Sequence, residues 1–221
     1  MRWVTGSRTN LRTSGIGICC ALAVLPTLIP GACLLLRVIP GTGSSLVNAW
    51  LGLGIGMVPV VMWCGALVWV RAQESFLILL GCLGVLVVVA CVWRSLPCLA
   101  ALGQVAVASG IGLILGRQFR RAWWLGIAAI AAFAADLWSV LAGPTHLVLE
   151  KAPAALNYLL IQVPALGGAT GLGLGTSDIL FLCLFLEGAR VCRLRVGWSL
   201  AAMLTGLMVA TGLAVAAGGG R

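Results

Sequence analysis

Charged side chains are scarce in this chain: of its 221 residues, 9% are charged and 62% are hydrophobic. Soluble domains carry about 25% charged residues. The composition therefore excludes an ordinary soluble domain, a disordered chain and a nucleic-acid-binding domain, and it predicts no nucleic-acid partner. The abundance of apolar residues predicts instead an integral membrane protein in contact with a lipid bilayer.

Residues that bind metals or form disulfide frameworks are also sparse or unpatterned. The chain contains a single histidine, His146, and its nine cysteines include no C-x-x-C pair. Most of these cysteines sit inside apolar runs, where cysteine behaves as a small hydrophobic residue. We therefore predict no metal site, no disulfide framework and no cofactor.

Long apolar stretches dominate what is present. Seven are long enough to cross a bilayer as helices. They predict a single all-α domain over residues 1–221, a polytopic membrane bundle of about seven transmembrane helices. The predicted spans are 15–36, 46–70, 75–93, 98–116, 122–142, 172–189 and 196–217.

Two parts of this arrangement allow more than one interpretation. The stretch 15–36 follows three arginines, as a signal peptide would, but we interpret it as a retained span because its apolar part is long. The gap 143–171 is the longest between spans. It could be a plain connector, an interfacial helix or a gate for substrate.

The basic residues predict an orientation. When the gaps between spans are assigned alternately to the two sides, one side collects ten basic residues and the other four. The positive-inside rule then places the N-terminus in the cytoplasm. The ten residues on the cytoplasmic side are Arg2, Arg8, Arg12, Arg71, Arg117, Arg120, Arg121, Arg190, Arg193 and Arg195.

Almost all of the basic residues are arginines, and the chain is rich in alanine and glycine. This composition is typical of a GC-rich bacterial genome, so we predict a bacterial inner membrane.

Two local patterns predict contacts inside the bundle. Three glycine pairs have the small-xxx-small spacing that lets helix backbones approach closely: Gly52 and Gly56, Gly112 and Gly116, and Gly171 and Gly175. Glu187 precedes Arg190 by three residues, a spacing at which the two side chains meet on one helix face.

The chain has only two aspartates, and both fall inside predicted spans. Asp136 lies six residues before the end of 122–142, and Asp178 lies six residues after the start of 172–189. A carboxylate at the bilayer centre costs about 2.5–3.5 kcal/mol on insertion scales, so such residues usually serve a function. Consecutive antiparallel helices are usually neighbours, and a rise of 1.5 Å per residue places both carboxyl groups about 9 Å below the same face.

Two carboxyl groups at one depth on adjacent helices can share a proton. One then acts as a general base on water and the other as a general acid, as in aspartic proteases. The same pair could instead be a proton relay or cation site in a transporter, or two separate residues that each bond to a helix backbone.

The residues around both aspartates carry a family resemblance. The segment Ala135-Asp136-Leu137-Trp138 and its Gly143-Pro144 exit resemble the first catalytic helix of presenilins and signal peptide peptidases. The segment Gly171-Leu172-Gly173-Leu174-Gly175-Thr176-Ser177-Asp178 is similar to the second, whose motif is G-x-G-D. The resemblance covers about 120–190. It departs from the family at Ala135, where tyrosine is usual, at Ser177, where glycine is usual, and in having no Pro-Ala-Leu after Asp178.

The resemblance implies an intramembrane aspartyl protease that cuts a locally unwound transmembrane helix without a cofactor. Asp136 and Asp178 would be catalytic, while Gly173, Gly175 and Ser177 would let an extended substrate approach the backbone. Two alternatives remain: a small proton- or cation-coupled transporter, and a pseudoprotease that binds membrane helices without cutting them.

Overall fold

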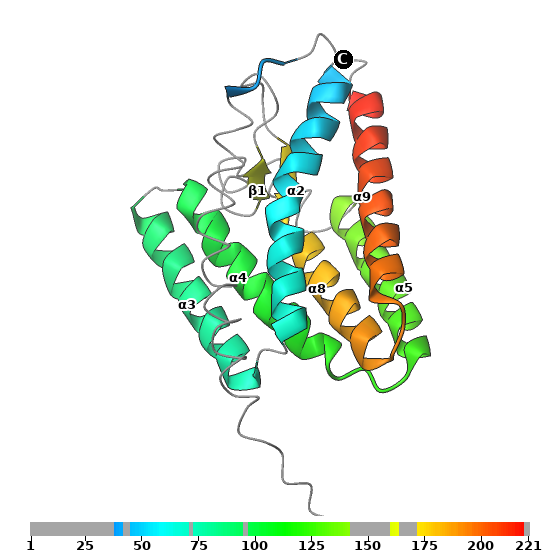
Figure 1. Ribbon diagram of the computed structural model, residues 1–221. Coiled ribbons are helices and arrows are strands. Elements are labelled where there is room, and N and C mark those ends of the chain that lie inside the picture. Colours follow the sequence, from blue (N-terminus) through cyan, green and yellow to red (C-terminus); the bar gives the residue numbers. More distant parts are fainter. Residues whose placement is uncertain are drawn as a thin grey trace, which may run out of the picture.

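The computed structural model describes residues 38–41, 45–70, 73–94, 97–141, 160–163 and 172–218. Over these ranges the chain is mostly helical, with one two-stranded hairpin (Figure 1). The predicted span 15–36 lies outside the described residues. In chain order the elements are α2 (Ser45–Val70), α3 (Glu74–Trp93), α4 (Pro97–Gly116), α5 (Ala122–Leu141), β1 (Leu160–Val163), β2 (Leu172–Gly175), α8 (Thr176–Val191) and α9 (Val196–Gly218).

Successive helices run in opposite directions, so their connections gather at two ends of the bundle (Figure 1). One end, which we call the arginine end, holds the connections 117–121 and 192–195. These two connections touch, because the Cys192 thiol lies 3.9 Å from the carbonyl oxygen of Phe119. The other end holds β1 and β2 (Figure 1) and is called the hairpin end.

Three of the described helices are long and apolar enough to cross a membrane: Trp50–Trp69, Glu74–Trp93 and Leu99–Gly116. Shorter apolar helices cover Ala122–Ala135 and Val196–Ala210. Helix α3 buries only one edge, and large side chains such as Leu79, Leu83 and Leu86 face outward. An outward apolar surface of this kind is what a lipid environment favours over water.

Helix α8 is the centre of the packing. It lies among α2, α4, α5 and α9 (Figure 1), and its contact with α4 is the most extensive. The prediction for Gly112 and Gly116 is confirmed, because both bring α4 against the α8 backbone. A β-carbon on Gly116 would lie 2.7 Å from the carbonyl oxygen of Leu184, and one on Gly112 would clash with that of Leu180. Glycine at these two positions therefore sets how closely α4 and α8 approach.

A buried polar contact joins α2 to α4. The Trp63 indole N–H donates to Ser109 Oγ at 3.0 Å, and that hydroxyl donates to the Val105 carbonyl at 2.6 Å. Both side chains are almost fully buried. Since an unpaired indole N–H would be costly in this apolar core, the contact fixes the rotation of α2 on α4.

The prediction of an all-α fold with a helix over 172–189 is wrong at one place. Residues Leu172–Gly175 form strand β2, and α8 begins only at Thr176. Glycines alternate with leucines up to Gly175, and each glycine inside a helix costs about 1 kcal/mol relative to alanine. Strand β1 also lies inside 143–171, so 160–163 are extended rather than part of an interfacial helix; the rest of that gap is outside the described residues.

Candidate functional site

Asp178 lies where the hairpin enters helix α8. It is the third residue of that helix, and its carboxylate Oδ2 accepts a hydrogen bond from the backbone N–H of Gly175 at 3.1 Å. A carboxylate in the first turn also interacts favourably with the positive end of the helix dipole. Asp178 is nevertheless exposed.

The strand before Asp178 is antiparallel to β1. Gly173 pairs with Gln162 and Gly175 pairs with Leu160. The pair Ile161 and Leu174 is buried against the bundle core, which anchors the hairpin. An extended backbone therefore runs directly into the first turn that carries Asp178.

Gly175 and Ser177 shape the space around the Asp178 carboxylate. A β-carbon at Gly175 would lie 3.2 Å from Asp178 Oδ2 and 3.2 Å from Ser177 Oγ. Any larger residue at position 175 would therefore crowd the carboxylate that its own N–H contacts. Ser177 itself is exposed beside Asp178.

Asp136 lies in α5, five residues before that helix ends at Leu141, and its side chain is outside the described residues. Helix α5 packs against α8 and runs in the opposite direction (Figure 1). The positions of the two aspartates in chain order therefore both fall toward the hairpin end of neighbouring helices. The structure brings Gly173, Gly175, Ser177 and Asp178 into one continuous segment.

The expected helical depth of Asp178 is corrected by the strand. Since the helix begins at Thr176, Asp178 occupies the first turn rather than a position six residues into a helix. The alternation of glycine and leucine over 171–175 has the two-residue period of a strand, and this signal could have predicted β2.

A second charged site lies at the arginine end, and it includes one more arginine than the sequence predicted. The Glu187 side chain is fully buried and accepts hydrogen bonds from Arg190 Nε at 2.9 Å and from Arg117 Nε at 3.0 Å. Its predicted partnership with Arg190 is confirmed, and a second contact comes from an Arg190 terminal nitrogen. Arg117 is seventy residues away in sequence, so no local spacing could reveal it.

Within the described ranges, no three His, Cys, Asp or Glu side chains lie close enough together to hold a metal ion. Comparison with known proteins adds no assignment: no family model matches the chain, and neither the curated proteins nor the solved structures contain a significant match.

Proposed function

We propose that this chain is an intramembrane aspartyl protease of the presenilin and signal peptide peptidase type, with Asp136 and Asp178 as its catalytic dyad. The observation that carries the proposal is the junction of β2 and α8. It presents an extended backbone next to an exposed carboxylate, and the helix that carries Asp136 packs against α8.

The chemistry requires a water molecule between two carboxyl groups. One ionised aspartate takes a proton from the water as it attacks the scissile carbonyl carbon, and the other, protonated, donates to the leaving amide nitrogen. Peptide bonds inside a helix are shielded, so the substrate must be locally extended. The glycines of β2 carry no side chains, which lets an extended substrate approach the backbone beside Asp178.

The proposal includes the membrane arrangement. We propose seven spans in a bacterial inner membrane, with the N-terminus and the arginine end in the cytoplasm and the hairpin end outside. Its support is that connections 117–121 and 192–195, both rich in arginine, meet at one end of the bundle. The substrate would then be a single membrane helix cut near its extracytoplasmic end.

One observation favours a second function, helix binding without cleavage. The Asp178 carboxylate already accepts the Gly175 N–H, so this residue has a structural role that needs no catalysis. Ser177 also stands where the resembling family has glycine. A pseudoprotease of this kind would keep the hairpin as a binding edge and lose the reaction.

The test is a cleavage assay in liposomes on a panel of single-span helices, with products identified by mass spectrometry. We expect wild type to cut at least one helix, and Asp136→Asn and Asp178→Asn each to reduce cleavage at least 1,000-fold. Asparagine at 178 keeps an oxygen that can accept the Gly175 N–H, so the loss would report chemistry rather than the missing contact. Glu74→Gln, which removes an exposed carboxylate on α3, is the matched control and should cut normally.

Other outcomes assign other functions. Retained cleavage in either aspartate variant would contradict the dyad. A folded wild type that cuts no helix, and that crosslinks to helices no better than the two aspartate variants do, would be the pseudoprotease. Uptake of an ion or solute that depends on a proton gradient and is lost in both aspartate variants would identify a transporter.

A further inference from the structure

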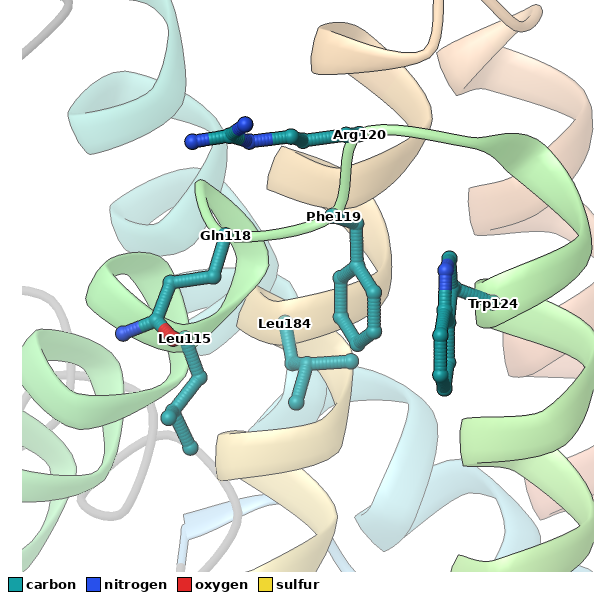
Figure 2. A pocket seen from close by; sticks show the side chains of 6 residues that line it. All are labelled: Leu115, Gln118, Phe119, Arg120, Trp124 and Leu184. Atoms are coloured by element: carbon teal, nitrogen blue, oxygen red, sulfur yellow. The ribbon is translucent and has the colours of Figure 1, made fainter.

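A cavity opens toward the arginine end of the bundle. Its volume is about 390 Å³, within the range of small-ligand sites. It lies between the end of α4, the connection to α5 and the middle of α8, as Figure 2 shows. The residues that line it are Leu115, Gln118, Phe119, Arg120, Trp124 and Leu184.

The cavity is polar at its outer edge and apolar inside. Figure 2 shows Arg120 extending across the end of α4 above Gln118, while Phe119 points inward toward Leu184. Trp124 closes the side formed by α5, and its ring stacks on that of Trp123 with centroids 4.4 Å apart. Tryptophan with one apolar and one polar side is enriched at the membrane–water boundary.

The charge around this cavity is almost entirely positive. Six arginines lie at or next to the arginine end: Arg117, Arg120, Arg121, Arg190, Arg193 and Arg195. The acidic side chain described at this end is Glu187, and it is buried between Arg117 and Arg190. Arg120 is exposed, and no acidic side chain in the described ranges forms an ion pair with it. The cavity therefore presents an exposed guanidinium that favours an anion.

The apolar side of the cavity continues into exposed apolar surface on α5. One turn beyond Trp124, the side chain of Ile127 is exposed on nearly the same face of that helix. A ligand with a phosphate at Arg120 would therefore find apolar surface along α5 for a hydrocarbon chain. A free phosphate would use only the polar edge, so the shape and composition favour an amphipathic anion.

We propose that this cavity binds an anionic glycerophospholipid, with the phosphate at Arg120 and Gln118 and the upper acyl chains on Phe119, Trp124 and the outer face of α5. The lipid would contact α4, α5 and α8 at the end where α4 is connected to α5 by only five residues. This site is separate from the proposed dyad and does not depend on protease activity.

The test is native mass spectrometry of the full chain in detergent, titrated with dioleoylphosphatidylglycerol or with dioleoylphosphatidylcholine. We expect tighter binding of phosphatidylglycerol, and a loss of about five-fold in its affinity in Arg120→Gln, which corresponds to one arginine near a membrane surface. Arg94→Gln is the matched control, because Arg94 is an exposed arginine that follows α3 at the opposite end of the bundle. It should leave binding unchanged.

A second pair of variants tests the apolar part without changing charge. Leu115→Trp fills the cavity and should weaken phosphatidylglycerol binding, whereas Leu99→Trp, an equally exposed leucine at the other end of α4, should not. Equal binding of the two lipids, or equal losses in Arg120→Gln and Arg94→Gln, would overturn the proposal. Competition by millimolar glycerol 3-phosphate that removes the bound lipid adducts would also overturn it, because it would show a site for a free phosphate.

Discussion

At the scale of single residues, the carboxylate of Glu187 combines full burial with ion pairs to two arginines. Its side chain has no exposed surface and is held by two arginines that are each partly exposed. A carboxylate in such a place is stable only while its partners remain, because burial without them costs several kcal/mol. Two of the arginines at this end, Arg117 and Arg190, therefore neutralise this group.

We expect Glu187→Ala to lower the stability of the protein by about 2–3 kcal/mol, because it removes charge-assisted hydrogen bonds and leaves two arginines facing a gap. The measurement is reversible unfolding in mixed detergent, followed by tryptophan fluorescence. Glu74→Ala removes an exposed carboxylate from the start of α3 and should change stability by less than about 0.5 kcal/mol. Equal effects of the two substitutions would show that the ion pairs contribute nothing.

At the scale of elements, contact between α4 and α8 depends on glycine rather than on large side chains. The carbonyl oxygen of Leu184 lies 2.7 Å from the position that a β-carbon on Gly116 would take, so the two backbones are in direct contact. Without a hydrophobic driving force between helices in lipid, such close packing is a main source of association. It also places the central helix, and with it Asp178, against the most buried helix of the three candidate spans.

We expect Gly116→Ala to destabilise the bundle by about 1–3 kcal/mol, because one helix must move to admit the new methyl group. Gly81→Ala is the matched control on α3, since nothing lies within 4 Å of a β-carbon there. It should leave stability unchanged or raise it slightly, as alanine favours helix over glycine. Unfolding in the same detergent system compares the two, and a stable Gly116→Ala protein would contradict the close approach of α4 and α8.

The hairpin shows how an element can be set by local chemistry and then anchored by distant contacts. Alternating glycines weaken the helix over 171–175, and the buried pair Ile161 and Leu174 then holds the strands against α2 and α4. The consequence for the candidate site is that Asp178 follows an extended segment. Inside a continuous helix, Asp178 would have no extended backbone next to it.

At the scale of the whole molecule, the two ends of the bundle differ in charge and in structure. Six of the described arginines lie at one end, and the hairpin with the candidate active site lies at the other, where Arg94 follows α3. Moving several arginines across a membrane is costly, so the arginine end should remain in the cytoplasm.

This orientation predicts the behaviour of fusions made at single positions. Green fluorescent protein joined after residue 119 or 195 should fluoresce in cells, and alkaline phosphatase joined after residue 95 should be active. A phosphatase fusion after residue 42 tests the first predicted span: activity there would show that 15–36 directs the following residues out of the cytoplasm, ahead of α2. Active phosphatase after residue 119 would contradict the orientation.

The apolar runs by themselves determined most of the helices. Backbone groups in lipid must bond within their own segment, so a run of about twenty apolar residues becomes a helix almost regardless of its neighbours. The predicted 46–70, 75–93, 98–116, 122–142 and 196–217 accordingly match α2, α3, α4, α5 and α9 within one residue at each end. The rarity of aspartate likewise indicates Asp136 and Asp178 as candidate site residues from the sequence alone.

Only the tertiary structure decided how these parts meet. It paired β2 with β1, which a strand needs because its backbone bonds lie between segments rather than within one. It brought Arg117 to Glu187 across seventy residues, and it placed α8, the shortest and most polar helix described, among four others. Each of these features depends on contacts between residues far apart in the chain. A pattern along one sequence indicates only contacts between residues that are close together in that sequence.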